Sequence, residues 1–514
     1  MSKTIIIIGA GLAGLSAALQ AAENGCNVKL VSSLPSERAQ SVMAEGGINA
    51  ALNTKDENDS PEEHFTDTIK AACGLADPNA VWGMTQAAPE LVHWLLKLGV
   101  KFNMSGYDDV DLRNFGGQKK KRTAFAQSDT GKQIMTAMID AVRRKEASGM
   151  VERFSHHSFL TLRLCGNICC GCVIRDEYSQ ETVELPGDAV IVAIGGMHGL
   201  FGNTTGSLSN TGEVTAELFR LGVPLANGEM IQYHPTTVKC GGKRMLISEA
   251  ARGEGGRLFA MKDGKQWYFM EEKYPELGNL MPRDITAREI WKVSHESEVF
   301  LDMTEISEEI ISNKLSGLAD DCMTYLHKDI RKEPVSVLPG IHYFMGGILV
   351  DEQHRTPIQN LYAAGECCAQ YHGANRLGGN SLLGALYGGR VAAKSACEQA
   401  DVVELSCATQ IDFPPASQIS EIKQLNKVMQ ETMGVVRNEN TLLNGIQTVQ
   451  ALTGNLPLLG MAVLKSALAR KESRGAHWRE DYPKSNDDDY LKTTVARFDG
   501  KQIQISFVPV PERR

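Results

Sequence analysis

Several features that would place this chain in a familiar class are missing. No apolar run reaches the roughly 18 residues that suggest a membrane-spanning helix, so the chain itself is not expected to cross a bilayer. Positive charge is not in excess, because the net charge is −9 and residues 119–122 form the single basic run. A nucleic-acid-binding surface is therefore not expected. Internal repeats and low-complexity segments are absent too, which leaves a globular chain of 514 residues, long enough for several domains.

Cysteine is present but does not follow a metal-binding or disulfide pattern. The 12 cysteines form no pair of CxxC motifs, and a chain of this size does not need disulfides to fold, so we expect a reducing, cytoplasmic location. The apolar run in the N-terminal "MSKTIIIIGAG" is too short for the core of a signal peptide, and it predicts a strand. Cys165, Cys169, Cys170 and Cys172 have β-branched neighbours, which predict a β-hairpin over 162–185 rather than a metal site.

Three apolar strands followed by glycine indicate an α/β, Rossmann-like sheet. Thr4–Ile8, a helix over Leu12–Asn24 and a strand over 27–32 make a βαβ unit. Similar strands within 187–196 and 358–366 are expected in the same sheet, interrupted by an insertion of mixed character over about 232–340. Helical spacing predicts helices over 420–436 and 441–454, and the tail from Ser473 returns to loops and short strands.

The glycine motif "GAGLAG" lies between the first strand and the first helix, as a dinucleotide-binding fingerprint requires. Gly9 is expected to permit the tight turn, Gly11 the approach of a pyrophosphate, and Gly14 close helix packing. The usual ribose carboxylate is replaced by Ser32 and Ser33 in "KLVSS", which favours FAD over NAD. Glu366 in "LYAAGE" would then hold the ribityl chain.

A second group of motifs supplies histidines and arginines on a glycine-rich backbone. A single His or Arg is more often structural than catalytic, but several such motifs around one cofactor domain favour a site for a small dianion, since Arg binds carboxylates bidentately. The motifs are "HPTT" from His234, "SEAARGEGG" from Ser248, "MPRD" from Met281, "HYFMGGI" from His342 and "HGANRLGGNSLLGALYGGR" from His372.

With these motifs, from "IIIIGAGLAGLSAAL" to "ESRGAHWREDYP", the chain resembles the flavoprotein subunit of succinate dehydrogenase and fumarate reductase, in a superfamily shared with L-aspartate oxidase. The resemblance implies an α/β FAD-binding domain with an inserted α+β capping domain, a helical domain and a short C-terminal segment. The corresponding ranges are 1–231 and 341–412 for the FAD domain, 232–340 for the cap, 413–472 for the helical domain and 473–514 for the C-terminal segment.

The resemblance also implies roles for individual residues. Arg283 would protonate fumarate as flavin delivers hydride, and Glu249 and Arg252 would relay protons to it. Ser248 stands where the family more often has threonine, and Glu213 where it commonly has aspartate. The implied substrate-binding residues are His234, Ser248, His342, Arg376, Phe115 and Gly47. The implied cofactor-binding residues are Gly9, Gly11, Leu12, Ala13, Gly14, Ser32, Ser33, Gln40, Ser41, Glu45, Gly46, Gly47, Ala193, Gly195, Glu213, Glu366, Arg376, Ser381 and Leu382.

Residues 38–47, "RAQSVMAEGG", depart from the family's "RSHTVAAEGG" at one informative position. Gln40 replaces the histidine that commonly bonds to the flavin, so the FAD is expected to be non-covalent and the reaction biased toward fumarate reduction. Gly46 and Gly47 are expected to let the backbone lie against the isoalloxazine, where a Cβ would collide.

The function implied is the interconversion of fumarate and succinate. The expected partners are an iron–sulfur subunit and, through it, a membrane subunit that reacts with quinone, at the cytoplasmic face of the membrane. L-aspartate oxidase and a stand-alone soluble reductase of fumarate or a related acid remain alternatives. A non-catalytic assembly subunit is disfavoured by the intact set of His234, Glu249, Arg283, His342 and Arg376.

Overall fold

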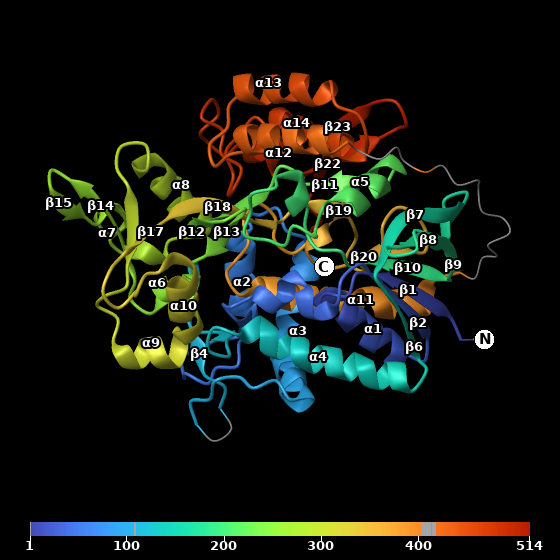
Figure 1. Ribbon diagram of the computed structural model, residues 1–514, viewed down its shortest axis with the longest axis horizontal. Helices are drawn as coiled ribbons and strands as arrows, with labels where there is room; N and C mark the ends of the chain where they lie inside the picture. Colours follow the sequence, from blue (N-terminus) through green and yellow to red (C-terminus); the bar gives the residue numbers. More distant parts are fainter. Residues whose placement is uncertain (1, 107–108, 402–412, 414–417) are drawn as a thin grey trace.

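The computed structural model describes residues 2–106, 109–401, 413 and 418–514. Figure 1 shows three regions: a large α/β body, a lobe at the left built from the chain between β12 (Ile231–Cys240) and β18 (Leu338–Phe344), and a group of helices along the top. In these described residues, no helix combines the length and the apolar character needed to cross a membrane.

The body is organised by a five-stranded parallel sheet in the order β20-β10-β1-β2-β6. The sheet unites the three strands predicted from separate parts of the sequence, which confirms that prediction. Its strands are β1 (Thr4–Ile8), β2 (Asn27–Ser32), β6 (Val151–Ser155), β10 (Ala189–Val192) and β20 (Leu361–Ala363).

Both faces of this sheet are covered, and the isoleucine run of β1 shows why. Ile5 and Ile7 pack with helices on one face, whereas Ile6 and Ile8 pack on the other, as the two-residue period of a strand requires. The helical layer contains α1 (Leu12–Glu23), α3 (Pro78–Leu98), α4 (Thr130–Ala147) and α11 (Asn380–Gln399).

The opposite face carries the predicted hairpin, extended to three strands: β7 (His157–Cys165), β8 (Ile168–Asp176) and β9 (Thr182–Pro186). Cys169 and Cys172 are buried in the apolar core between this sheet and the central one. They are packing residues, as their neighbours in the sequence indicated.

The left lobe begins and ends on two neighbouring antiparallel strands, β12 (Ile231–Cys240) and β18 (Leu338–Phe344). It has its own apolar core. The lobe contains β13 (Lys243–Leu246), β14 (Arg257–Lys262), β15 (Lys265–Trp267), β16 (Val299–Asp302), β17 (Val335–Ser336), α6 (Glu249–Gly253), α7 (Phe269–Lys273), α8 (Arg283–Val293), α9 (Glu308–Lys314) and α10 (Ser316–Asp321).

The upper helices are α12 (Ile419–Thr432), α13 (Glu439–Gln450) and α14 (Asn455–Ala469), so both predicted helices are present. Their core is shared with strands of a second sheet, ordered β21-β19-β11-β22-β23, and the predicted tail strand is β23 (Ile503–Pro509). The domain boundaries remain predictions, and the one at 412/413 falls where the chain is not described. The other strands of this sheet are β11 (Leu225–Ala226), β19 (Gly347–Leu349), β21 (Cys368–Ala369) and β22 (Lys492–Phe498).

Further elements complete the body and the C-terminal segment: α2 (Pro61–Ala71), α5 (Glu213–Arg220), α15 (Asp487–Tyr490), and a small sheet of β3 (Ile48–Asn49), β4 (Leu112–Arg113) and β5 (Thr123–Ala124).

Candidate active site

A cavity of about 590 Å³ runs from the β1–α1 turn to the base of the left lobe. It is lined by nearly all of the residues proposed from the sequence, although they come from distant parts of the chain. These are Gly9, Gly11, Leu12, Ala13, Ser32, Ser33, Gln40, Ser41, Glu45, Gly46, Gly47, Phe115, Ala193, Gly195, Glu213, His234, Ser248, Glu249, Arg283, His342, Glu366, Arg376, Ser381 and Leu382. Gly14 and Arg252 lie behind this lining.

The β1–α1 turn has the geometry expected of a pyrophosphate-binding loop. Gly9 has a φ of +107°, and a Cβ there would lie 2.3 Å from the Ala193 carbonyl oxygen. A Cβ at Gly14 would lie 1.9 Å from the Gly9 oxygen, so this glycine serves helix packing. Around Gly11, by contrast, the nearest side-chain atoms are 3.8 Å from the position of a Cβ. The protein leaves this space open at the N-terminus of α1, where backbone N–H groups favour an anion.

The ribose end of the cavity also fits the cofactor. Ser32, at the end of β2, has a buried hydroxyl oxygen with no hydrogen-bond partner, and it lines the cavity beside Ser33. A ribose hydroxyl would satisfy it. Glu366 lines the cavity farther along, where its Oε1 accepts a hydrogen bond of 3.1 Å from the Phe344 N–H. Together with the open Gly11 turn, these groups fit FAD.

The segment from Gln40 to Gly47 follows the cavity wall, and packing within the protein gives its two glycines a reason that the sequence did not predict. A Cβ at Gly46 would lie 2.7 Å from the Phe115 ring, and one at Gly47, with a φ of +135°, would lie 2.5 Å from the Ala124 oxygen. The collisions are with the protein itself. Close packing within the chain therefore already requires glycine at both positions, and the predicted contact of this backbone with the isoalloxazine stays a prediction.

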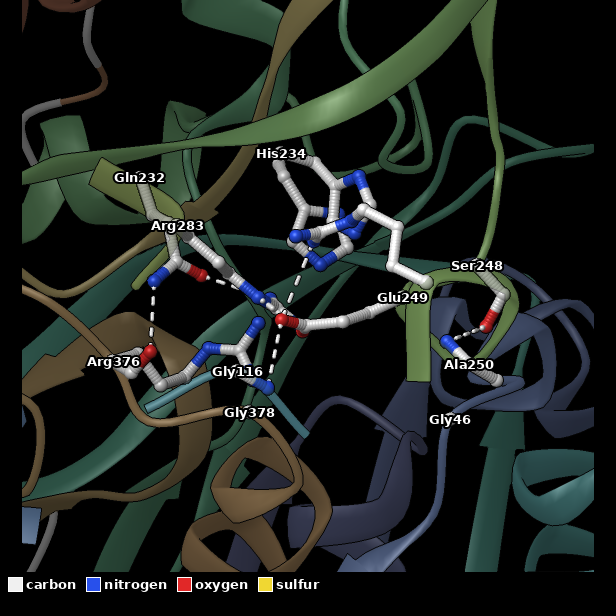
Figure 2. Close-up of polar contacts among 12 residues, drawn as sticks. Gly46, Gly116, Gln232, His234, Ser248, Glu249, Ala250, Arg283, Arg376 and Gly378 are labelled. Carbon is white, nitrogen blue, oxygen red and sulfur yellow. Dashed lines mark hydrogen bonds and ion pairs between the residues drawn. The ribbon is translucent and has the colours of Figure 1, made fainter. Parts of the chain in front are cut away.

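At the other end of the cavity, separate elements of the lobe bring polar side chains together (Figure 2). His234 comes from β12 and His342 from β18, and their rings are 5.1 Å apart between centroids. Ser248 is the N-cap of α6, where its hydroxyl accepts a hydrogen bond from the Ala250 N–H, and Arg283 is the first residue of α8. Arg376 approaches from the loop before α11, within the body of the molecule.

Glu249 is the hub of these contacts. Its Oε2 accepts hydrogen bonds from Arg283 Nη2 at 2.6 Å and Nε at 2.8 Å, and its Oε1 accepts one from the Gly116 N–H at 3.1 Å. Arg252 Nη2 is 3.3 Å from the same Oε1. Arg252 and Arg283 thus contact different oxygens of Glu249, and Arg283 lines the cavity whereas Arg252 does not.

Burial and charge set the protonation states of this cluster. Burial alone would raise the pKa of Glu249, but Arg283 and Arg252 outweigh it and hold the pKa below its usual value. Burial, followed by the charge of Arg283, lowers the pKa of His234 and His342 well below the usual value, so both are neutral near pH 7. Burial lowers the pKa of Arg376 to about 9, with Arg283 as the next cause.

Arg376 has capacity for a ligand. Its guanidinium carbon lies 4.3 Å from the centroid of the Tyr343 ring, yet its buried Nε has no hydrogen-bond partner. A buried, unpaired donor of this kind is costly unless a ligand satisfies it. The cavity wall here can therefore receive an anion.

Sequence reasoning missed several supporting residues. Gln232 accepts a hydrogen bond of 3.1 Å from Arg283 Nη1 and donates to the Arg376 carbonyl oxygen, so it ties the lobe to the body (Figure 2). Its position two residues before His234, on the same face of a strand, was an available signal. Thr205, whose hydroxyl lies 2.8 Å from His342 Nδ1, had no comparable signal.

Comparison with known proteins agrees with this arrangement. Residues 4–382 match the family described as "FAD binding domain", and residues 452–513 match "Fumarate reductase flavoprotein C-term". The chain is 38% identical to the succinate dehydrogenase flavoprotein subunit of Bacillus subtilis, over 100% of this chain and 98% of that one. It is 32% identical to the 8-methylmenaquinol:fumarate reductase flavoprotein subunit of Wolinella succinogenes, over 100% and 92%.

Among solved structures, the FrdA chain of E. coli quinol fumarate reductase superposes with a TM-score of 0.90 at 27% identity, covering 99% of this chain and 97% of that one. The sequence and structure matches span both the FAD-binding body and the C-terminal segment. The protein is an FAD-dependent oxidoreductase and belongs to the family of succinate dehydrogenase and fumarate reductase flavoprotein subunits.

Proposed function

We propose that the chain interconverts fumarate and succinate, with a bias toward fumarate reduction, as the flavoprotein subunit of a larger complex. The observation that carries the proposal is the Arg283–Glu249–Arg252 line, which ends at the cavity beside two neutral histidines and Arg376.

The substrate end of the cavity suits a small molecule with two carboxylates. His234 and His342 are neutral donors on the lobe strands β12 and β18, and Arg376, on the loop before α11 in the body, is a cation with an unpaired N–H. Ser248 adds a hydroxyl. Donors from the lobe and from the body would bind the two carboxylates separately and allow one to twist out of conjugation, which makes the double bond more electrophilic.

FAD, when bound, supplies the hydride for the reduction. Arg283 lies at the cavity with its guanidinium fixed by Glu249 and Gln232, which supports its role as the group that would give a proton to the substrate carbon. Glu249 bridges Arg283 and Arg252, and a proton lost from Arg283 would return through this bridge. Burial of all three groups keeps bulk water away from the transfer.

Gln40 supports a non-covalent flavin, because its amide has no nucleophilic ring nitrogen to bond to the isoalloxazine. It lines the cavity at the start of the 3-10 turn Gln40–Met43. A histidyl bond raises flavin potential, so its absence favours reduction of fumarate. Acid denaturation of the holoprotein should release free yellow FAD, and colour that stays with the protein would contradict this assignment.

The proposed partners are an iron–sulfur subunit that carries electrons and, beyond it, a membrane subunit that reacts with quinol, at the cytoplasmic face. The names of the Wolinella and E. coli relatives, both of which specify a quinol, support an electron supply of this kind. Co-purification of the native chain with a cysteine-rich iron–sulfur protein would test it. Isolation as an active single chain would favour a stand-alone reductase.

The direct test is an assay of the purified holoprotein with fumarate and a reduced dye, and with succinate and an oxidised dye. We expect both reactions, with fumarate reduction faster. Oxidation of L-aspartate by oxygen without succinate turnover would instead identify an L-aspartate oxidase.

A further inference from the structure

Two cysteines meet at the end of the FAD-binding body where α1 and α11 finish. Cys26 lies in the turn between α1 and β2, and Cys397 lies in the last turn of α11. Their sulfur atoms are 3.0 Å apart, which is about 1 Å longer than a disulfide bond, and both are free thiols. The residues are 371 positions apart in sequence, so this contact exists only because the two helices pack together.

The surroundings make one of the thiols reachable and the other its buried partner. Cys26 is 5% exposed, whereas Cys397 is half-buried at the protein surface. The ammonium group of Lys3 donates a hydrogen bond of 2.7 Å to the Cys397 carbonyl oxygen, which places a positive charge beside this thiol. Because Cys397 is the more exposed of the two, an oxidant can reach its thiol, and the Cys26 thiol lies in contact with it.

We propose that Cys26 and Cys397 are a redox-sensitive thiol pair that a peroxide closes to a disulfide. The Cys397 sulfur, after losing its proton, attacks one peroxide oxygen, and the O–O bond breaks to give a sulfenic acid and water. The Cys26 sulfur then attacks the Cys397 sulfur, the S–O bond breaks and a second water leaves. In sum, two thiols and one hydrogen peroxide give one disulfide and two waters, and a dithiol reductant reverses the oxidation.

The chemistry of Cys397 sets the speed of this reaction. Burial, followed by the contact with Cys26, raises the pKa of the Cys397 thiol, and Lys3 only partly opposes the rise. Because the thiolate is the attacking form, closure is slow at neutral pH and accelerates as pH increases. The pair therefore responds to sustained oxidant.

The disulfide would act as a clamp on the cofactor site, because it would join the ends of α1 and α11 that lie away from the FAD cavity. α1 and α11 pack closely: a Cβ at Gly389 would lie 2.2 Å from the Ala13 oxygen, and the Ser16 hydroxyl donates to the Leu386 oxygen at 2.6 Å. The N-terminal ends of the same helices line the FAD cavity through Leu12 and Ser381. A covalent link at their C-terminal ends limits their separation, so the oxidised protein should unfold at a higher temperature and release FAD more slowly.

The test uses the full-length holoprotein, oxidised with hydrogen peroxide or reduced with dithiothreitol. Remaining thiols are blocked with N-ethylmaleimide, and the digest is analysed by mass spectrometry without reduction. We expect a peptide linked through Cys26 and Cys397 in the oxidised sample only, formed faster at higher pH. The oxidised sample should also melt a few degrees higher and lose FAD fluorescence quenching more slowly on heating.

Three variants separate the pair from general oxidation. Cys26→Ser and Cys397→Ser should each abolish the linked peptide and the melting shift, whereas Cys73→Ser, at a partly exposed cysteine elsewhere, should keep both. Recovery of Cys26 and Cys397 as separately blocked or separately oxidised residues in the peroxide-treated wild type would overturn the proposal. Formation of the link without any change in melting or FAD release would overturn the clamp.

Discussion

Two buried clusters of arginine and glutamate lie in different regions of this protein. They differ in whether the N–H groups of their arginines all have hydrogen-bond acceptors. In the active-site cluster, Arg376 keeps an unpaired Nε and Arg283 lines the cavity. In the second cluster, at the junction of α14 with the C-terminal segment, every N–H group of Arg470 has an acceptor, including Glu229 and Glu472. A buried arginine with spare donors beside a cavity indicates a binding site, whereas a saturated one indicates structure.

The junction cluster includes Glu472 and Arg474 of the motif "ESRGAHWREDYP", which helped to identify the family. Glu472 accepts from both Arg470 and Arg474, and the Asn486 N–H completes its shell. These contacts hold the C-terminal segment against α14. A motif can thus identify a family while its own residues do structural work.

The largest effect should come from Arg283→Ala in the active-site cluster. Loss of the proton donor should lower fumarate reduction by about 10²- to 10⁴-fold, because that is the usual contribution of a positioned acid. FAD should stay bound, since Arg283 lies at the substrate end of the cavity. The measurement is steady-state fumarate reduction with the FAD content of the same sample. Turnover near the wild-type rate with bound FAD would remove Arg283 from the mechanism.

Arg470→Met should act on stability instead. It leaves Glu229 and Glu472 buried without their common cation, which costs about 3–5 kcal/mol of unfolding free energy. Any protein that remains folded should keep its activity per bound FAD. Denaturant unfolding and the activity per flavin test both points, with Arg331→Ala, at a surface ion pair, as the control expected to change stability by about 1 kcal/mol or less. Loss of activity in folded Arg470→Met would break the distinction between the clusters.

The sequence predicts the body of this protein better than its active site, for a physical reason. Local apolar runs, and the glycine turns that follow them, predict strands such as Thr4–Ile8. The site depends on β12 pairing with β18 across about a hundred residues, and spacing alone could not join His234 to His342; the resemblance did so. Thr205 and the packing role of Gly46 depend on side-chain directions, which no local pattern shows. For Gln232, the two-residue period of the strand that holds His234 did offer a signal.

Glu45 is a titrating group at the boundary between lobe and body, and its effect should appear in the pH dependence of stability. Burial, followed by the nearby charge of Asp321 in the lobe, raises the pKa of Glu45 to about 8 from 4.5. The folded protein therefore keeps a proton that the unfolded chain loses near pH 4.5. Stability should fall as pH rises between these two values, and the loss should be complete above about pH 8.

Glu45→Gln cannot ionise and should remove this pH dependence, so its advantage over the wild type should grow from about pH 5 to pH 8. Melting temperatures of both holoproteins across this range provide the measurement. Glu37→Gln, at an exposed glutamate paired with Arg143, is the control and should show no such trend. Parallel wild-type and Glu45→Gln curves would show that Glu45 is ionised in the folded protein throughout.

The smallest effect should come from Ser248→Thr, which restores the residue more common in the family. Threonine keeps the hydroxyl that caps α6, and it adds one methyl group to a residue that lines the cavity. We expect kcat/KM for fumarate to change by about threefold or less. Ser248→Ala is the informative partner, because it removes the hydroxyl and should raise KM for fumarate well beyond that range. If both variants behave alike, the hydroxyl does not contact the substrate, and the spare donors that distinguish the active-site cluster reduce to Arg376 and the two histidines.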